Sequence, residues 1–195
     1  VVLVPVAGIG GACAVVAEGC ESGGHIGELT TMTLVPQVAD AVSVPVIAAG
    51  GIADGRGIAA AFMLGAKGVQ CGTRFLASCE CAIHENYKDQ VVRARDIDTM
   101  VTGRRLGHPV RALKSSYMQA FRQKEEDASV TNAQLEAFGS GALRKAAREG
   151  DLEGGCFMAG QAAGLVKDCR PVKEIIAEMF TQAEECLKGA ARWAK

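Results

Sequence analysis

Hydrophobic residues along this chain form short continuous runs, and helical patterns separate the later runs from one another. A strand that is buried on both faces needs continuous rather than alternating hydrophobicity, and such strands belong to parallel sheets. The runs that we expect to form strands are Val1–Val6, Cys13–Ala17, Val44–Ala49 and Gly68–Gly72.

Two segments between these runs have the spacing of helices. Thr33–Val42 places apolar residues at helical intervals, and Gly57–Leu64 is an alanine-rich run. The second helix should end at Gly65, because glycine commonly terminates helices. Strands and helices therefore alternate, which predicts an α/β fold.

The sequence becomes more polar after Phe75. It predicts three parts: a sheet unit over residues 1–81, an appended and mostly helical subdomain over 82–150, and a return loop with a final helix over 151–195. We expect the final helix to pack back on the sheet unit. The later helices are expected at Tyr87–Ala94, Ser116–Asp127, Asn132–Phe138, Ala142–Glu149 and Pro171–Trp193, and short strands at Thr99–Gly103 and Val110–Leu113.

Composition narrows the class of protein. The chain is 49% hydrophobic and 22% charged, with a net charge of -1, so it lacks the basic patch that nucleic acids or anionic membranes would require. Its apolar runs are far shorter than the ~20 residues of a spanning helix. Eight cysteines include a CxC pair, Cys79 and Cys81, without a matching CxxC pattern. Reduced thiols in a cytoplasmic protein are therefore favoured over a zinc site or disulfides.

Two glycine-containing turns follow predicted strands. Ala49-Gly50-Gly51 comes after the third run, and Gly72-Thr73 comes after the fourth. Bare backbone amides and one hydroxyl at neighbouring strand ends can hold an anion, and barrels of parallel strands place their phosphate site in such loops. The alternative is that these glycines only make tight turns.

His25 lies in the run Glu21-Ser22-Gly23-Gly24-His25, directly after the second predicted strand. Barrel enzymes place catalytic groups at this end of a strand, and an imidazole there can donate a proton near neutral pH. A loop histidine that bonds a backbone carbonyl is an equally good interpretation. We interpret His84 and His108 as structural. The run Met158–Gln161 reads either as a ligand-facing loop or as the start of a helix.

Longer segments resemble a known family. The runs AVVAEGCESGGHIGELTTMTLVPQV, PVIAAGGIADGRGIAAAFMLGAKGVQCGTRF, NYKDQVVRARDIDTMVTGRRLGHPVRALK and GDLEGGCFMAGQAAGLV are similar to enoyl-acyl-carrier-protein reductase II. That family is related in fold to the nitronate monooxygenases. The likeness covers nearly all of the chain from Ala12 onward, and it implies a (β/α)₈ barrel.

The resemblance also implies an activity and a site. It implies FMN at the mouth of the barrel, NADH as electron donor, and reduction of trans-2-enoyl thioesters carried by acyl carrier protein. Monovalent cations are associated with such enzymes, but the resemblance assigns no ligand for one here, and a homodimer is one option for the assembly. On this basis His25 is the expected catalytic residue. The expected cofactor-binding residues are Gly23, Gly24, Ala49, Gly50, Gly51, Gly72, Thr73, Gly160 and Gln161.

Two other functions stay open. A nitronate monooxygenase would use FMN and O₂ with a similarly placed histidine as base, and a non-enzymatic protein would only bind a flavin or a phosphate. Ile26 and the Thr30-Thr31-Met32 stretch favour the reductase by resemblance.

The start of the chain departs from the family pattern. Only Ala7–Ala12 separates the first two predicted strands, whereas adjacent parallel strands need a crossover of about a dozen residues or more. We therefore expect a missing segment between Val6 and Ala12, in preference to an antiparallel pairing. The early barrel strands of the family have no counterpart here, so the chain is expected to hold only strands 5–8.

Overall fold

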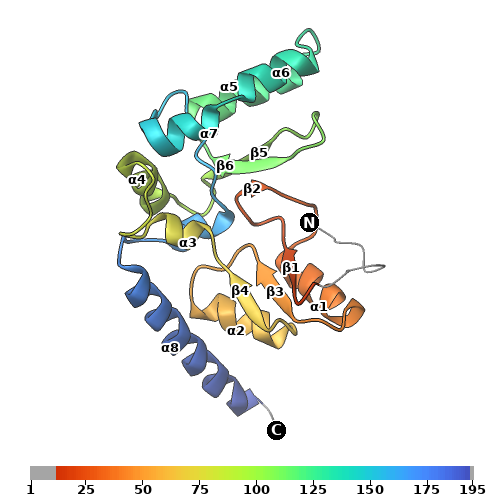
Figure 1. Ribbon diagram of the computed structural model, residues 1–195, viewed down its shortest axis with the longest axis vertical. Coiled ribbons are helices and arrows are strands. Elements are labelled where there is room, and N and C mark those ends of the chain that lie inside the picture. The colour runs from red at the N-terminus through yellow and green to blue at the C-terminus, as the bar shows by residue number, and fades with distance from the viewer. Residues whose placement is uncertain (1–11, 194–195) are drawn as a thin grey trace.

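Two sheets and the helices around them make up most of residues 12–193, which are the residues that the computed structural model describes (Figure 1). The strands are β1 (Val15–Glu18), β2 (Gly24–His25), β3 (Val46–Ala49), β4 (Gly68–Gln70), β5 (Thr99–Thr102) and β6 (Val110–Leu113). The α-helices are α1 (Thr31–Ala41), α2 (Gly55–Met63), α3 (Thr73–Leu76), α4 (Glu85–Arg93), α5 (Ser116–Glu126), α6 (Asn132–Gly139), α7 (Ala142–Arg144) and α8 (Val172–Ala190). A π-helical turn, η1 (Lys145–Glu149), and two 3-10 turns, η2 (Gln161–Leu165) and η3 (Ala191–Trp193), complete the set.

The first sheet is parallel and has the strand order β1-β3-β4. Val15 pairs with Val46 and Ile47 pairs with Gly68, so the three apolar runs of the sequence lie side by side. The predicted α/β arrangement is confirmed. Within the described residues this sheet is open rather than a closed barrel. The first predicted strand, Val1–Val6, and the gap expected after it lie outside those residues.

Both helices beside this sheet begin two residues earlier than their apolar spacing predicted, because polar groups cap them. The Asp54 side chain accepts hydrogen bonds from the amides of Arg56 and Gly57 and so caps α2. Burial opposes ionisation of this carboxyl. The hydrogen bonds from Arg56 and Gly57 nevertheless hold the pKa of Asp54 below its ordinary value. The first amide of α1 bonds instead to a remote carboxylate, Glu21.

The long helix α8 packs against α2, in keeping with the position expected for the final helix. Ile175, Met179 and Ala183 on one face of α8 are buried in the same core as the parallel sheet. The contact requires glycine at position 55, since a Cβ there would lie 2.4 Å from the backbone of Ala183. The backbones of the two helices therefore touch at this point.

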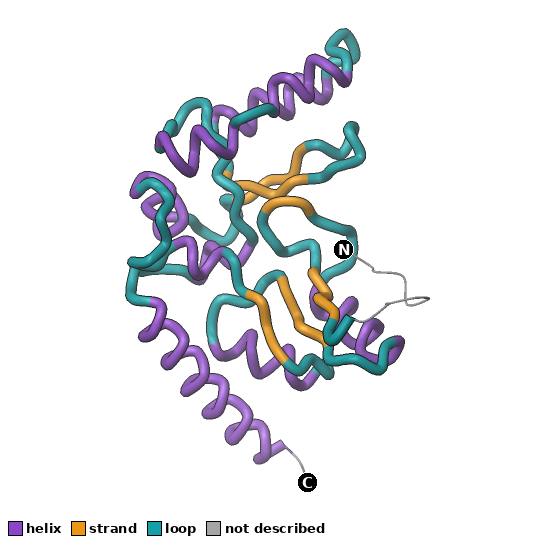
Figure 2. Tube along the Cα trace, viewed as in Figure 1, coloured by secondary structure: helices purple, strands orange, loops and turns teal. Residues whose placement is uncertain are grey.

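The second sheet is antiparallel and has the order β2-β6-β5. Both β5 and β6 were predicted as short strands, but their antiparallel pairing and the third strand of the sheet were not. β2 consists of only two residues, Gly24 and His25, which pair with Arg111 and Val110 of β6. Figure 2 shows the strands of this sheet beside one another, above the parallel sheet. The loop that carries His25 follows β1 of the parallel sheet, yet it contributes a strand to the antiparallel sheet on which α5 packs.

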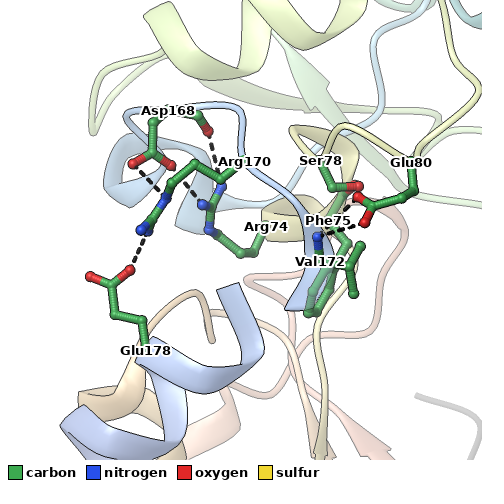
Figure 3. A network of polar contacts seen from close by, with 8 residues as sticks. All are labelled: Arg74, Phe75, Ser78, Glu80, Asp168, Arg170, Val172 and Glu178. Atoms are coloured by element: carbon green, nitrogen blue, oxygen red, sulfur yellow. Dashed lines mark hydrogen bonds and ion pairs between the residues drawn. The ribbon is translucent and has the colours of Figure 1, made fainter. Parts of the chain in front are cut away.

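A polar network joins α3 to the segment before α8 (Figure 3). The buried Arg74 donates to Asp168 at 2.7 Å, and Arg170 bridges from Asp168 to Glu178 on α8. On the other side, the Glu80 carboxylate accepts from the first amide of α8 at 2.9 and 3.0 Å. Because Pro171 at the start of this helix offers no side-chain cap, Glu80 supplies one.

None of the helices within residues 12–193 has both the length and the apolar character needed to cross a membrane. Cys13, which lies in an apolar run, is exposed, whereas Cys71 is half-buried.

Candidate active site

A cavity of about 320 Å³ opens at the carboxyl ends of β1, β3 and β4. Eight of the nine residues predicted to bind the cofactor line it, and the exception is Gln161, which is exposed and outside the lining. We call this space the glycine cavity. Its lining residues from that prediction are Gly23, Gly24, Ala49, Gly50, Gly51, Gly72, Thr73 and Gly160.

One wall of the glycine cavity is made of unpaired backbone amides. Gly50 and Gly51 have φ angles of +95° and +72°, which L residues rarely adopt, and they turn the chain sharply after β3. In the described part of the chain, the amides of Gly51, Gly72 and Thr73 have no protein acceptor. Such a concentration of free donors is suited to an anion.

Thr73 contributes differently from the prediction. Its hydroxyl oxygen accepts a hydrogen bond of 2.9 Å from the Gly160 amide, so it fastens the return segment to the strand end. The hydroxyl proton is still available for a ligand oxygen. At Gly72, a Cβ would meet no atom within 4 Å, which means that the protein leaves open space in front of this residue.

The glycines at positions 23 and 160 are needed by the protein itself. A Cβ on Gly23 would lie 2.6 Å from the Ala159 carbonyl carbon, and one on Gly160 would lie 2.5 Å from the Glu21 carbonyl oxygen. The two segments are therefore packed backbone to backbone. The Gln161 amide adds a hydrogen bond of 2.8 Å to the Glu21 carbonyl. These glycines need no ligand to explain them.

Replacing Gly160 with alanine should therefore destabilise the fold. Its φ and ψ of -80° and 173° suit alanine, so the cost comes from the backbone clash and should be about 1–3 kcal/mol. Urea unfolding measures it. Gly189→Ala in α8 is the control, because no atom lies within 4 Å and helix propensity should stabilise it by up to about 1 kcal/mol. An unchanged unfolding midpoint for Gly160→Ala would contradict the packing argument.

Glu21 lies beside the amide wall of the glycine cavity, and its carboxylate is bonded to the start of α1. Its two carboxylate oxygens each accept from the Thr31 amide at 3.0 Å, and one also accepts from the Thr31 hydroxyl. This carboxylate caps α1, where the helix dipole stabilises negative charge.

His25 faces a second cavity of about 460 Å³, which we call the apolar cavity. Pairing of β2 with β6 holds its backbone, and the Ile26 amide donates to the Pro109 carbonyl at 3.0 Å. The buried Arg111 guanidinium also bonds the Cys20 carbonyl at 3.1 Å, which ties the histidine loop to β6. The lining of this cavity includes Leu106, Val110, Tyr117, Met118, Phe121, Leu135, Leu143, Cys156 and Met158.

The two cavities adjoin. Leu143 and Met158 line both of them, and the Tyr87 hydroxyl donates to the Met158 carbonyl at 2.7 Å, which fixes the wall between them. Burial raises the pKa of the thiols of Cys71 in one cavity and Cys156 in the other to about 11. Both thiols are therefore protonated and uncharged at neutral pH.

Comparison with known proteins places this arrangement in a family. The family model for nitronate monooxygenase matches residues 5–182. The chain belongs to the nitronate monooxygenase family. A "Probable nitronate monooxygenase" of Staphylococcus aureus is 37% identical over 186 residues, which is 90% of this chain and 52% of that protein.

Two solved structures are similar to this family member. FabK from Thermotoga maritima is 50% identical with a TM-score of 0.90, covering 94% of this chain and 58% of that one. The nitroalkane oxidase of Streptomyces ansochromogenes is 29% identical with a TM-score of 0.76, covering 92% and 54%. The chain spans about half the length of the curated relatives that it matches.

Several residues of this nitronate monooxygenase family member were not expected at the site. His108 lines the apolar cavity with its ring centroid 6.3 Å from that of His25, although His108-Pro109 reads as a turn. Ser22 and Tyr87 line the glycine cavity. Tyr87 and His108 reach the site through contacts between distant segments, so no local pattern in the sequence could have indicated them, whereas Ser22 directly precedes the predicted residue Gly23.

Proposed function

We propose that this protein is a flavin-dependent reductase of trans-2-enoyl thioesters carried by acyl carrier protein, with FMN as cofactor and NADH as electron donor. The observation that carries the proposal is the apolar cavity beside the glycine cavity, with His25 on its wall. Binding sites for apolar ligands are concave, mostly hydrophobic and supplied with few polar groups. An acyl chain needs such a space, and a small nitronate does not.

The glycine cavity fits FMN on three features of this chain. The free amides of Gly51, Gly72 and Thr73 suit its phosphate, and the open space before Gly72 lets that group approach the backbone. Gly24 has only the Met158 sulfur within 4 Å of a would-be Cβ, which leaves room for a flat ring. Bound there, FMN would supply the redox chemistry, while the protein would supply binding and orientation.

His25 would act on the substrate from the apolar cavity. Its backbone is held on β2, and the residue lines the apolar cavity, which shares Leu143 and Met158 with the glycine cavity. A neutral or charged imidazole can donate a hydrogen bond to a thioester carbonyl or a proton to the reduced product. Arg111 would support this role only through the loop that carries His25.

Nitronate oxidation is the second candidate, and the family model together with the curated staphylococcal relatives favours it. The same histidine would then serve as a base towards a small nitronate, with O₂ as the oxidant. This alternative leaves most of the apolar cavity without a use. It also gives no reason for the apolar side chains of Leu106, Phe121 and Leu135 that line it.

Purified protein loaded with FMN separates the two functions. We expect NADH oxidation to accelerate on addition of a crotonyl or longer enoyl thioester, with a lower KM for the longer chain because more apolar surface is buried. A small nitronate with O₂ should give slow turnover. Turnover on the nitronate that exceeds turnover on every enoyl thioester would overturn the proposal in favour of the monooxygenase.

A further inference from the structure

Ser22 carries a polar group for which the protein provides no partner. The residue is only 8% exposed and lines the glycine cavity. Within residues 12–193, its buried hydroxyl oxygen makes no hydrogen bond to any other group. A buried hydroxyl without a partner is costly, and native proteins seldom keep one unless a ligand or water satisfies it.

The backbone of Ser22 is nevertheless well fixed. Its amide donates to the Gly19 carbonyl at 3.2 Å. Its carbonyl carbon lies against Gly160, where the backbones of the two segments are in contact. Only the side chain is free to respond to a ligand. Rotation about its Cα–Cβ bond moves the hydroxyl between staggered positions without moving the backbone.

The neighbours of Ser22 show which part of a ligand it would meet. On one side, Glu21 lies beside Gly51, since a Cβ on Gly51 would come within 3.4 Å of the Glu21 Cβ. On the other side, Gly23 lies against Ala159. Ser22 is thus between the amide wall, which suits an anion, and the glycines that precede His25, which suit a flat ring.

We infer that the Ser22 hydroxyl binds the polyol chain that links the phosphate of FMN to its ring. The inference rests on the proposed flavin site and adds to it a recognition residue for vicinal hydroxyl groups. A polyol can both donate to and accept from a serine, so either hydrogen-bond direction satisfies the buried oxygen. Nothing in this assignment requires enoyl reduction.

Three flavins of increasing size test the assignment by equilibrium binding to the purified protein. Lumiflavin has the ring alone, riboflavin adds the polyol, and FMN adds the phosphate. Ser22→Ala should raise the Kd for riboflavin and for FMN by the same factor, about 2- to 10-fold, which is typical of one neutral hydrogen bond. The Kd for lumiflavin should not change. Ser43→Ala, an exposed serine after α1, is the control and should leave all three values unchanged.

Thermal unfolding of the flavin-free Ser22→Ala protein shows whether the substitution itself destabilises the fold. Removal of an unpartnered hydroxyl should leave the melting temperature unchanged or raise it. Equal weakening of lumiflavin would place the contact on the ring, and a larger loss for FMN than for riboflavin would place it on the phosphate; either result overturns the inference. Unchanged binding of all three flavins to Ser22→Ala would overturn the inference about Ser22 and leave the proposed function standing. Wild-type protein that binds no flavin would overturn both the inference and the proposed function.

Discussion

Replacing His25 with alanine should lower turnover on an enoyl thioester about 10²–10⁴-fold, the range that a general acid typically contributes. FMN content and reduction of the flavin by NADH should stay close to wild type, because the histidine side chain lines the apolar cavity and not the glycine cavity. The backbone pairing of β2 with β6 does not depend on the imidazole and should persist. Stopped-flow measurement separates the two half-reactions.

The matched control is His84→Asn. His84 is an exposed histidine that lines neither cavity, and its ring nitrogen accepts a hydrogen bond from the Asn86 amide at the start of α4. Asparagine keeps an acceptor there, so the variant should match wild type in both half-reactions. Full turnover by His25→Ala would remove the residue from the mechanism.

Gly72→Val should abolish tight binding of FMN while leaving the protein folded. The backbone of Gly72 has φ and ψ of -90° and -62°, which any residue adopts, and its Cβ would meet no protein atom. The side chain would instead occupy the space before the free amides. Loss of two hydrogen bonds to a charged phosphate, at about 1.5–3 kcal/mol each, predicts a Kd raised about 10²–10⁴-fold. Fluorescence titration measures this change.

Riboflavin gives this second experiment its internal control. Because riboflavin has no phosphate, Gly72→Val should weaken it much less than FMN. The corresponding change at Gly51 is a poorer test, since a positive φ of +72° would strain any side chain there and would confuse misfolding with lost binding. Retention of full FMN affinity by a folded Gly72→Val protein would show that the phosphate lies elsewhere.

Much of the fold could be predicted from local patterns, and the reasons are physical. Strands of the parallel sheet are buried on both faces, so their runs of apolar residues stand out, and β6 was placed at Val110–Leu113 as observed. The predicted starts of α1 and α2 were two residues too late. The remote Glu21 caps α1 and Asp54 caps α2, and these caps extend each helix beyond its apolar pattern. The irregular turn η1 has no local signal that distinguishes it from an ordinary helix.

The candidate site was harder to predict because it is assembled by long-range contacts. Glycines after strands pointed to the amide wall, and eight of the nine predicted cofactor residues do line one cavity. Gly23 and Gly160 were expected to bind the cofactor, but the structure gives another reason for glycine at both positions. Each packs its backbone directly against the backbone of a segment far away in sequence, which leaves no room for a Cβ. A two-residue strand such as β2 has no periodicity to detect, so the proximity of His25 to His108 could not be foreseen.

Residues 156–161 link both sheets at once. Within this segment the Phe157 carbonyl accepts from the Leu113 amide of β6, and the Gly160 amide donates to Thr73 at the end of the parallel sheet. Local opening of the segment would break both connections together, and this would couple the unfolding of the walls of the two cavities. A ligand that orders the segment from one side also lowers the entropic cost of binding on the other side. Cofactor and substrate would then assist each other's binding through rigidity alone, without any change of shape.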